Sequence, residues 1–165
     1  MSTGVASAAQ SEFRQVHFDT LEDLLAEIDT LVAADHAGTL RATGNWTPGQ
    51  IFGHLAAWIE YSYEGYPSEM QPPWFVRMIA RMMKRRFLSK PMRRGFRIPG
   101  IAAGTYGTEL MSTEAGAARL RSAIARLQCH EPARFHSPAL GKMTDEERIA
   151  VSLRHAEVHL GYLIP

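Results

Sequence analysis

Histidines are the side chains in this sequence whose spacing most directly suggests chemistry. His155 and His159 are four residues apart in a segment with helical periodicity, so they should project from one face, one turn apart. Two imidazoles at this spacing can bind one metal ion. His54 lies beside the apolar stripe of another expected helix, and all three could therefore point into a helical core. The spacing predicts one divalent metal ion, zinc, nickel or iron, on these three side chains.

The same positions also allow a plainer interpretation. The chain has seven histidines in 165 residues, and random placement alone gives roughly 0.3 pairs at a spacing of four. A histidine beside an apolar stripe is often a helix-surface residue bonded to a carbonyl group. The segment His155–His159 also lacks the zinc-protease pattern, because Glu157 is two residues from each histidine and should face solvent. The other histidines are expected at surface or loop positions: His17, His36, His130 and His136.

Four amphipathic segments are expected to position these side chains. The clearest helix start is Thr47-Pro48-Gly49-Gln50, where a capping box is combined with proline at the first helical position. Thr144 and Glu147 form a second capping box before the last helix. No convincing strand is visible. The pattern predicts an all-α protein, a four-helix bundle with helices over residues 20–34, 47–64, 112–128 and 144–163.

The connection between the second and third of these helices is long and strongly basic. It covers residues 65–112 and is expected to contain an extra amphipathic helix at about residues 73–88. No acidic residue occurs between Glu69 and Glu109, although the whole chain has a net charge of only +1. Nine of its eighteen basic residues lie here: Arg77, Arg81, Lys84, Arg85, Arg86, Lys90, Arg93, Arg94 and Arg97.

Length and composition favour one domain. Residues 1–15 are small and polar and are expected to form a flexible tail, followed by a single helical domain over residues 16–165. The only cysteine, Cys129, excludes a disulfide within the chain, and no signal peptide or membrane span is visible. We therefore expect a cytoplasmic protein.

Several motifs resemble those of the DinB/YfiT-like superfamily of metalloenzymes, and more closely a branch known only as a domain of unknown function. They are residues 45–51 with Gly53-His54-Leu55, residues 153–160, Gly95-Phe96-Arg97-Ile98-Pro99 and Leu140–Thr144. The likeness covers most of residues 18–163. It implies a four-helix bundle of up-down-down-up order, for which the long connection is suited as a crossover between parallel neighbours. It also implies metal ligands at His54, His155 and His159. Characterised relatives include transferases and isomerases that use low-molecular-weight thiols.

These observations suggest a metal-dependent enzyme that transfers or displaces a group on a thiol. Tyr61 and Tyr162 each follow a predicted ligand by seven residues and are the candidate catalytic donors, with Ser152 a weaker candidate. The crossover should pass the mouth of the metal cavity. Its arginines would bind an anionic small molecule, plausibly a thiol cosubstrate with carboxylates. The candidates are Arg93, Arg94 and Arg97, in its glycine- and proline-rich part.

The alternative is a non-catalytic binding module. Residues 73–97 combine apolar and basic side chains and could bind an anionic partner or a membrane surface. No nucleic-acid-binding motif is present, so nucleic acid is not an expected partner. The interpretation that we favour for the apolar face of residues 74–87 is packing, either on its own bundle or across a homodimer.

Overall fold

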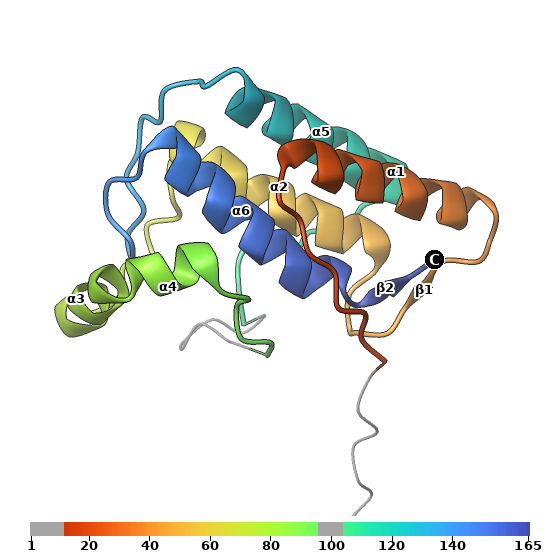
Figure 1. Cartoon of the computed structure of the whole chain (residues 1–165), viewed down its shortest axis with the longest axis horizontal. Helices are drawn as coiled ribbons and strands as arrows, with labels where there is room; N and C mark the ends of the chain where they lie inside the picture. The colour runs from red at the N-terminus through yellow and green to blue at the C-terminus, as the bar shows by residue number, and fades with distance from the viewer. Residues whose placement is uncertain (1–11, 96–103) are drawn as a thin grey trace, which may run out of the picture.

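The structure is a computed structural model of the whole chain, and it describes residues 12–95 and 104–165 (Figure 1). The helices in these residues are α1 (Leu21–His36), α2 (Pro48–Glu64), α3 (Trp74–Met82), α4 (Lys84–Ser89), α5 (Thr113–Gln128) and α6 (Asp145–Leu160). The predicted all-α class is confirmed. Two short strands that the sequence did not indicate, β1 (Arg41–Ala42) and β2 (Leu163–Ile164), pair in antiparallel fashion. In the part of the chain described, no helix has both the length and the apolar character needed to cross a membrane.

The predicted helix starts are confirmed by their hydrogen bonds. The Thr47 side chain accepts a hydrogen bond from the Gln50 backbone N–H, and the Gln50 side chain accepts one from Thr47 N–H. Pro48 occupies the first turn, where it removes no intrahelical hydrogen bond. Thr144 and Glu147 make the same reciprocal pair at the start of α6. Caps of this kind stabilise a helix by about 1 kcal/mol each.

The four long helices, α1, α2, α5 and α6, share one hydrophobic core, which we call the helical core (Figure 1). Helices α2 and α5 approach most closely, because glycines face each other at their first turns. A β-carbon at Gly116 would lie 2.5 Å from the carbonyl oxygen of Gly49. The fully buried side chains come from all four helices and include Leu24, Ile28, Leu31, Phe52, Leu120, Ile124 and Leu160.

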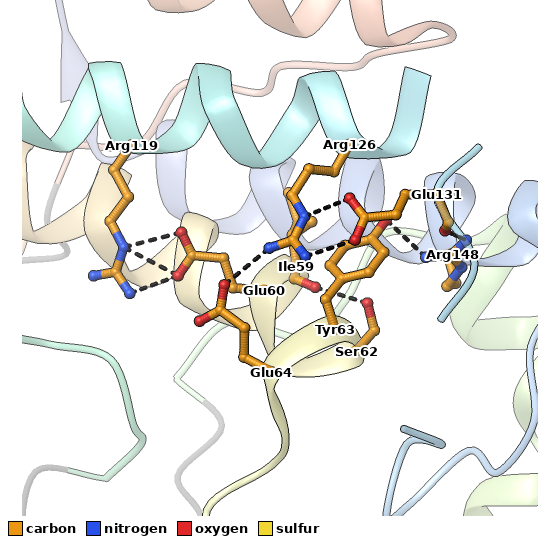
Figure 2. Close-up of polar contacts among 9 residues, drawn as sticks. All are labelled: Ile59, Glu60, Ser62, Tyr63, Glu64, Arg119, Arg126, Glu131 and Arg148. Atoms are coloured by element: carbon orange, nitrogen blue, oxygen red, sulfur yellow. Dashed lines mark hydrogen bonds and ion pairs between the residues drawn. The ribbon is translucent and has the colours of Figure 1, made fainter. Parts of the chain in front are cut away.

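Ion pairs reveal the relative direction of α2 and α5 (Figure 2). Arg119 of α5 pairs with Glu60 of α2, with 2.6 Å between Nη2 and Oε2. At least one turn further along both helices, Arg126 pairs with Glu64 at 2.9 Å. Later residues of one helix therefore meet later residues of the other, so α2 and α5 run parallel. Parallel neighbours cannot be joined by a short turn, which explains the long crossover between them.

Helix α6 runs antiparallel to α2. The buried Arg148 in its first turn donates a 2.7 Å hydrogen bond to the hydroxyl of Tyr63 near the end of α2 (Figure 2). Arg148 also pairs with Asp145 at 2.7 Å and donates to the backbone carbonyl of Glu131. These partners offset much of the cost of burying its charge. They also fix the register in which α6 presents its later residues to the first half of α2.

The crossover helices α3 and α4 lie outside the helical core, and neither buries a residue (Figure 1). The single helix expected here is interrupted at Met83, whose φ of −87° and ψ of 2° are not helical. On α3 the side chains of Trp74 and Met82 are 74% and 79% exposed. The part of this face on α3 therefore does not pack on the helical core, and packing across a homodimer stays a prediction. Helix α4 is attached to α6 through Lys84, whose Nζ pairs with Glu147 and donates to a loop carbonyl.

The chain before α1 lies against the end of α6. Of the expected tail, residues 1–11 are outside the described residues, whereas residues 12–15 pack on the protein. Arg14 donates its backbone N–H to the carbonyl of Gly161 at 2.8 Å and its Nε to that of Leu163. The ring of Phe13 packs edge-on against Tyr162, with centroids 5.0 Å apart. Residues 12–15, which composition alone suggested were tail, therefore pack on the end of α6.

Candidate metal centre

The structure brings His54, His155 and His159 together, from α2 and α6. One ring nitrogen of each lies within 4.8 Å of those of the other two, so the group could hold a metal ion. The Nε2 atoms of His54 and His155 are 3.1 Å apart. Because two ligands at about 2.0–2.1 Å from a tetrahedral zinc ion are roughly 3.3–3.4 Å from each other, this separation is close to that of a shared ion.

A hydrogen bond orients the ring of His54. Its Nδ1 lies 2.8 Å from the backbone carbonyl oxygen of Tyr106, which can only accept, so Nδ1 carries the proton. The Nε2 atom then carries a lone pair directed at His155. Without an ion, His155 must be protonated at its own Nε2 to avoid opposing lone pairs. With an ion between them, both lone pairs can ligate. A carbonyl behind a ligating histidine is the usual means of fixing its tautomer.

Burial keeps the three imidazoles neutral. His54 is 1% exposed, and desolvation lowers its pKa to about 4, even though the Tyr106 carbonyl acts in the opposite direction. Burial and then the proximity of His54 lower the pKa of His159 to about 3. The pKa of His155 is also lowered well below its usual value, first by burial and then by the two neighbouring histidines. All three are therefore neutral at physiological pH, which is the form that binds metal.

The crossover itself supplies the Tyr106 carbonyl, and a glycine makes this approach possible. Gly107 has a φ of +74°, and a β-carbon there would lie 2.7 Å from the Cβ of Ala57 on α2. Gln50 holds the same segment by donating its side-chain N–H to the carbonyl of Thr108 at 3.1 Å. Sequence reasoning missed this contact because any residue type has a backbone carbonyl. Its only sequence signal was the glycine.

Two tryptophans form an aromatic wall around the histidines. Trp46 stacks on His159 with centroids 5.3 Å apart and an interplanar angle of 9°. Trp58 lies edge-on to His155 at 5.3 Å and to His54 at 5.9 Å. Its indole N–H is buried and has no hydrogen-bond acceptor in the described residues. An unsatisfied buried donor is costly, so an acceptor held at the histidines would be favourable here.

The expectation for Glu157 is wrong, because this residue is only 4% exposed. Its carboxylate pairs with Arg154 at 2.9 Å, accepts the backbone N–H of Phe18 at 3.0 Å and lies 2.8 Å from Nδ1 of His17. The helical wheel correctly placed Glu157 opposite the histidines. However, the chain entering α1 covers that side of α6. Glu157 is therefore an anchor for the N-terminal segment and is remote from any role as a general base.

The three candidate donors occupy different surroundings. Tyr61 is half-buried, with its ring 6.1 Å from that of Trp58, and burial raises the pKa of its hydroxyl, so it stays protonated at physiological pH. Tyr162 lies in the turn after α6 and packs on the N-terminal segment. Ser152 donates its hydroxyl to the carbonyl of Arg148 at 2.8 Å, within its own helix. The catalytic roles of the two tyrosines stay predictions.

Of the arginines expected to bind an anion, Arg93 and Arg94 lie in the described residues. The guanidinium of Arg94 lies over the ring of Phe13, 4.4 Å from its centroid. Arg93 is exposed. Arg97 is outside the described residues. Their role as ligands for an anionic molecule also stays a prediction.

Fold and site together define a helical protein with a cluster of three neutral histidines, one buried and two half-buried, at which a metal ion could bind. Residues 10–165 match the family described as "Protein of unknown function (DUF1569)", and the chain belongs to this family. The expectation of a family without a known function is thereby confirmed, and membership of the DinB/YfiT-like superfamily stays a prediction. No curated protein and no solved structure matches the chain.

Proposed function

We propose that this protein holds one divalent metal ion on His54, His155 and His159 and is a metal-dependent enzyme that transfers or displaces a group on a thiol. The observation that carries the proposal is the geometry of the cluster. Its ring nitrogens converge from two helices, and His54 is held by Tyr106 in the tautomer that ligation requires. Three neutral nitrogen ligands suit zinc, nickel or iron(II).

Three protein ligands leave a coordination position open, as in catalytic rather than structural sites. The ion would supply Lewis acidity there, favouring the deprotonated form of a low-molecular-weight thiol at neutral pH. The residues around the cluster contribute hydrogen bonding and exclusion of water. The Trp58 indole N–H is a donor without a partner, and the protonated hydroxyl of Tyr61 is a candidate donor to the substrate. Arg93, Arg94 and Arg97 are the proposed contacts for carboxylates on the thiol.

We also propose that the helical core is a four-helix bundle of the DinB/YfiT-like type, with up-down-down-up order. The parallel direction of α2 and α5 and the antiparallel direction of α6 support this order. So does α1, whose last residue, His36, contacts Glu114 at the start of α5. A crossover that returns to touch a ligand histidine is consistent with a site at the centre of such a bundle.

Metal content tests the proposal directly. Protein purified without a nickel column should contain about one divalent ion per chain, and His155→Ala should lose most of it. His36→Ala is the matched control, because His36 is an exposed histidine paired only with Glu114. Equal metal content in the native protein, in His155→Ala and in His36→Ala would contradict the assignment of the metal site to these histidines.

Thiol binding tests the reaction class. After cobalt substitution, a thiol with carboxylates, such as glutathione, should change the visible spectrum of the metal, and this change should saturate. The Arg93/Arg94/Arg97 triple alanine variant should shift saturation to higher thiol concentration, because it removes three positive charges near the carboxylates. A spectrum that does not respond to any thiol would exclude the thiol as the ligand.

We propose a second candidate function, binding of α3 to an anionic membrane surface. The observation that favours it is the exposed apolar face of α3, where Trp74, Phe75 and Met82 lie in solvent beside arginines. A short helix with an aromatic and aliphatic face and a basic border is suited to an anionic lipid interface. Pairing α3 with a second copy of itself would bring like charges together, because the crossover carries no acidic residue between Glu69 and Glu109.

Co-sedimentation with vesicles tests this second function. Vesicles containing phosphatidylserine should bind the protein, those of phosphatidylcholine alone should not, and Trp74→Gln with Met82→Gln should abolish the difference. Light scattering gives the alternative outcome. If the native protein is a homodimer and the same double variant is a monomer, the apolar face of α3 binds a second copy of the chain instead.

A further inference from the structure

A pocket of about 380 Å³ lies between α3, the end of α2 and the loop before α6. This volume is within the range of small-molecule sites, roughly 300–1,000 Å³. Tyr66 forms part of its lining, together with the loop residues His136 and Ser137. None of these belongs to the histidine cluster, and the pocket lies at the opposite end of α2 from the residues around His54.

The lining of this pocket carries positive charge only. Arg77 and Arg81 are one turn apart on α3, and Lys142 faces them from the loop before α6. Among the described residues that line the pocket, there is no aspartate or glutamate. Unpaired cations gathered around a concave surface raise the local concentration of anions and favour their binding.

Two contacts connect the elements that carry these cations. The guanidinium of Arg81 lies against Gly141, where a β-carbon would be 3.2 Å from Nε and 3.6 Å from Cζ. Gly141 has a φ of +74°, which glycine adopts without strain. On the other side, Lys84 of α4 donates to the carbonyl of Lys142 at 2.9 Å and so fixes the loop to the crossover helices. The pocket is therefore built from contacts between two elements, and it gathers the exposed side chains of Arg81 and Lys142 with the half-buried side chain of Arg77.

Neutral donors complete the lining. Tyr66 and Ser137 are hydroxyl-bearing residues of the lining, and Ser137 Oγ accepts the backbone N–H of Leu140 at 3.1 Å. Burial raises the pKa of Tyr66 to about 12, so its hydroxyl is not an anion at physiological pH and does not repel one. The chemistry of the lining is thus two guanidinium groups, one ammonium group and hydroxyl donors around one cavity.

We propose that this pocket binds the phosphate group of a small phosphomonoester. A phosphate monoester carries about −1.5 to −2 charges near pH 7 and three acceptor oxygens, so it matches three cations better than a single carboxylate does. Arginine guanidiniums bind phosphate through paired N–H donors. The site is independent of the metal proposal, because none of its residues contacts the histidine cluster.

Titration of the full chain with inorganic phosphate and with phenyl phosphate tests the proposal, for example by phosphorus NMR. Binding should saturate, and it should be weakened at least about tenfold by Arg77→Gln with Arg81→Gln. Arg85→Gln with Arg86→Gln is the matched control, since it removes the same number of charges from exposed positions on the neighbouring helix α4. The control should change affinity by no more than about twofold, because exposed charges at a distance are screened by salt.

The outcomes separate this site from the alternatives. An equal loss of phosphate affinity in the two double variants, or phosphate binding that never saturates, would overturn the proposal. Either result would indicate diffuse electrostatic attraction to the basic crossover. Binding only to vesicles that contain phosphatidic acid, lost in Arg77→Gln with Arg81→Gln but kept in the control, would assign the same pocket to a lipid phosphate. Phosphate binding that persists in the His155→Ala variant would show that the pocket operates whether or not the histidines hold metal.

Discussion

Helix α6 places its histidines among neutral aromatic rings, whereas α3 exposes its apolar side chains and carries only positive charge. Around α6, every buried charge named above has a partner, as Glu157 has in Arg154. Around α3, the charges surround a pocket that contains no carboxylate among its described lining residues. The contrast indicates that the helical core provides the stability and the candidate metal ligands, while the crossover provides the exposed apolar and basic surface. The predictions that follow test this division.

The largest effect is expected from Glu157→Ala. The substitution leaves Arg154 buried without its carboxylate partner and releases the backbone of Phe18, which should lower the free energy of unfolding by about 3–5 kcal/mol. Denaturant unfolding measures this change. Glu146→Ala, at an exposed position on the same helix, should change the free energy by less than about 1 kcal/mol. Similar losses in both variants would contradict the anchoring role.

Removal of metal should have a comparable but smaller effect. If the ion binds only the folded protein, it adds about 4 kcal/mol at a free concentration of a thousand times Kd. Chelation should then lower Tm by roughly 8–16 °C for a chain of this size. The His155→Ala variant should show no shift on chelation. The double variant Arg85→Gln/Arg86→Gln is changed only in the crossover, so it should keep the full shift in Tm. Loss of the Tm shift in this variant would contradict the proposed independence of the two regions.

Two glycines test one of the places where the crossover meets the helical core. Gly107→Ala should cost about 2–4 kcal/mol, because it combines an unfavourable positive φ with the clash against Ala57. Displacement of the Tyr106 carbonyl should also weaken metal binding about 10–100-fold. Gly95→Ala has a similar φ of +71° but open space around it, so it should cost only about 1 kcal/mol and leave metal affinity unchanged. Equal metal affinity in both variants would show that the carbonyl does not position His54.

The smallest effect is expected on α3. Trp74→Gln with Met82→Gln removes two large apolar side chains, yet it should change the free energy of unfolding by less than about 0.5 kcal/mol, because both are already in solvent. Leu153→Ala on α6 should cost about 2–5 kcal/mol. Thermal or denaturant unfolding of the two variants measures the difference. A large loss in the α3 variant would mean that its apolar face is covered in solution.

Sequence alone was sufficient for the elements whose determinants are local. The capping boxes at Thr47 and Thr144 marked the starts of the two helices that carry the histidines, and the apolar stripes then placed all three histidines at the border of the core. Helical periodicity relates residues within a few turns, so it transfers directly from pattern to structure. The convergence of the three histidines follows from these two helices packing together.

The features that sequence did not predict depend on distant parts of the chain. A helical wheel correctly places the side chain of Glu157 on the face opposite the histidines. It cannot show that the distant segment at Phe18 covers that face. The strand pair of Arg41–Ala42 with Leu163–Ile164 joins residues more than a hundred positions apart, and two-residue strands have no periodicity to detect. The pocket beside α3 was not predicted either, because nothing local indicated that α3 would lie near the loop at Lys142.

The parallel arrangement of α2 and α5 has a consequence for how this chain can change in length. The entropy of closing a flexible loop grows only with the logarithm of the number of residues, so doubling such a loop costs about 0.6 kcal/mol. The connection between Glu64 and Thr113 is already long, and its helices α3 and α4 bury no residue. Insertions or deletions that spare the segment around Tyr106 should therefore leave the histidines in place. The parallel arrangement of α2 and α5 requires a long crossover. The crossover is therefore also the part of the protein where an insertion should lower the free energy of unfolding least.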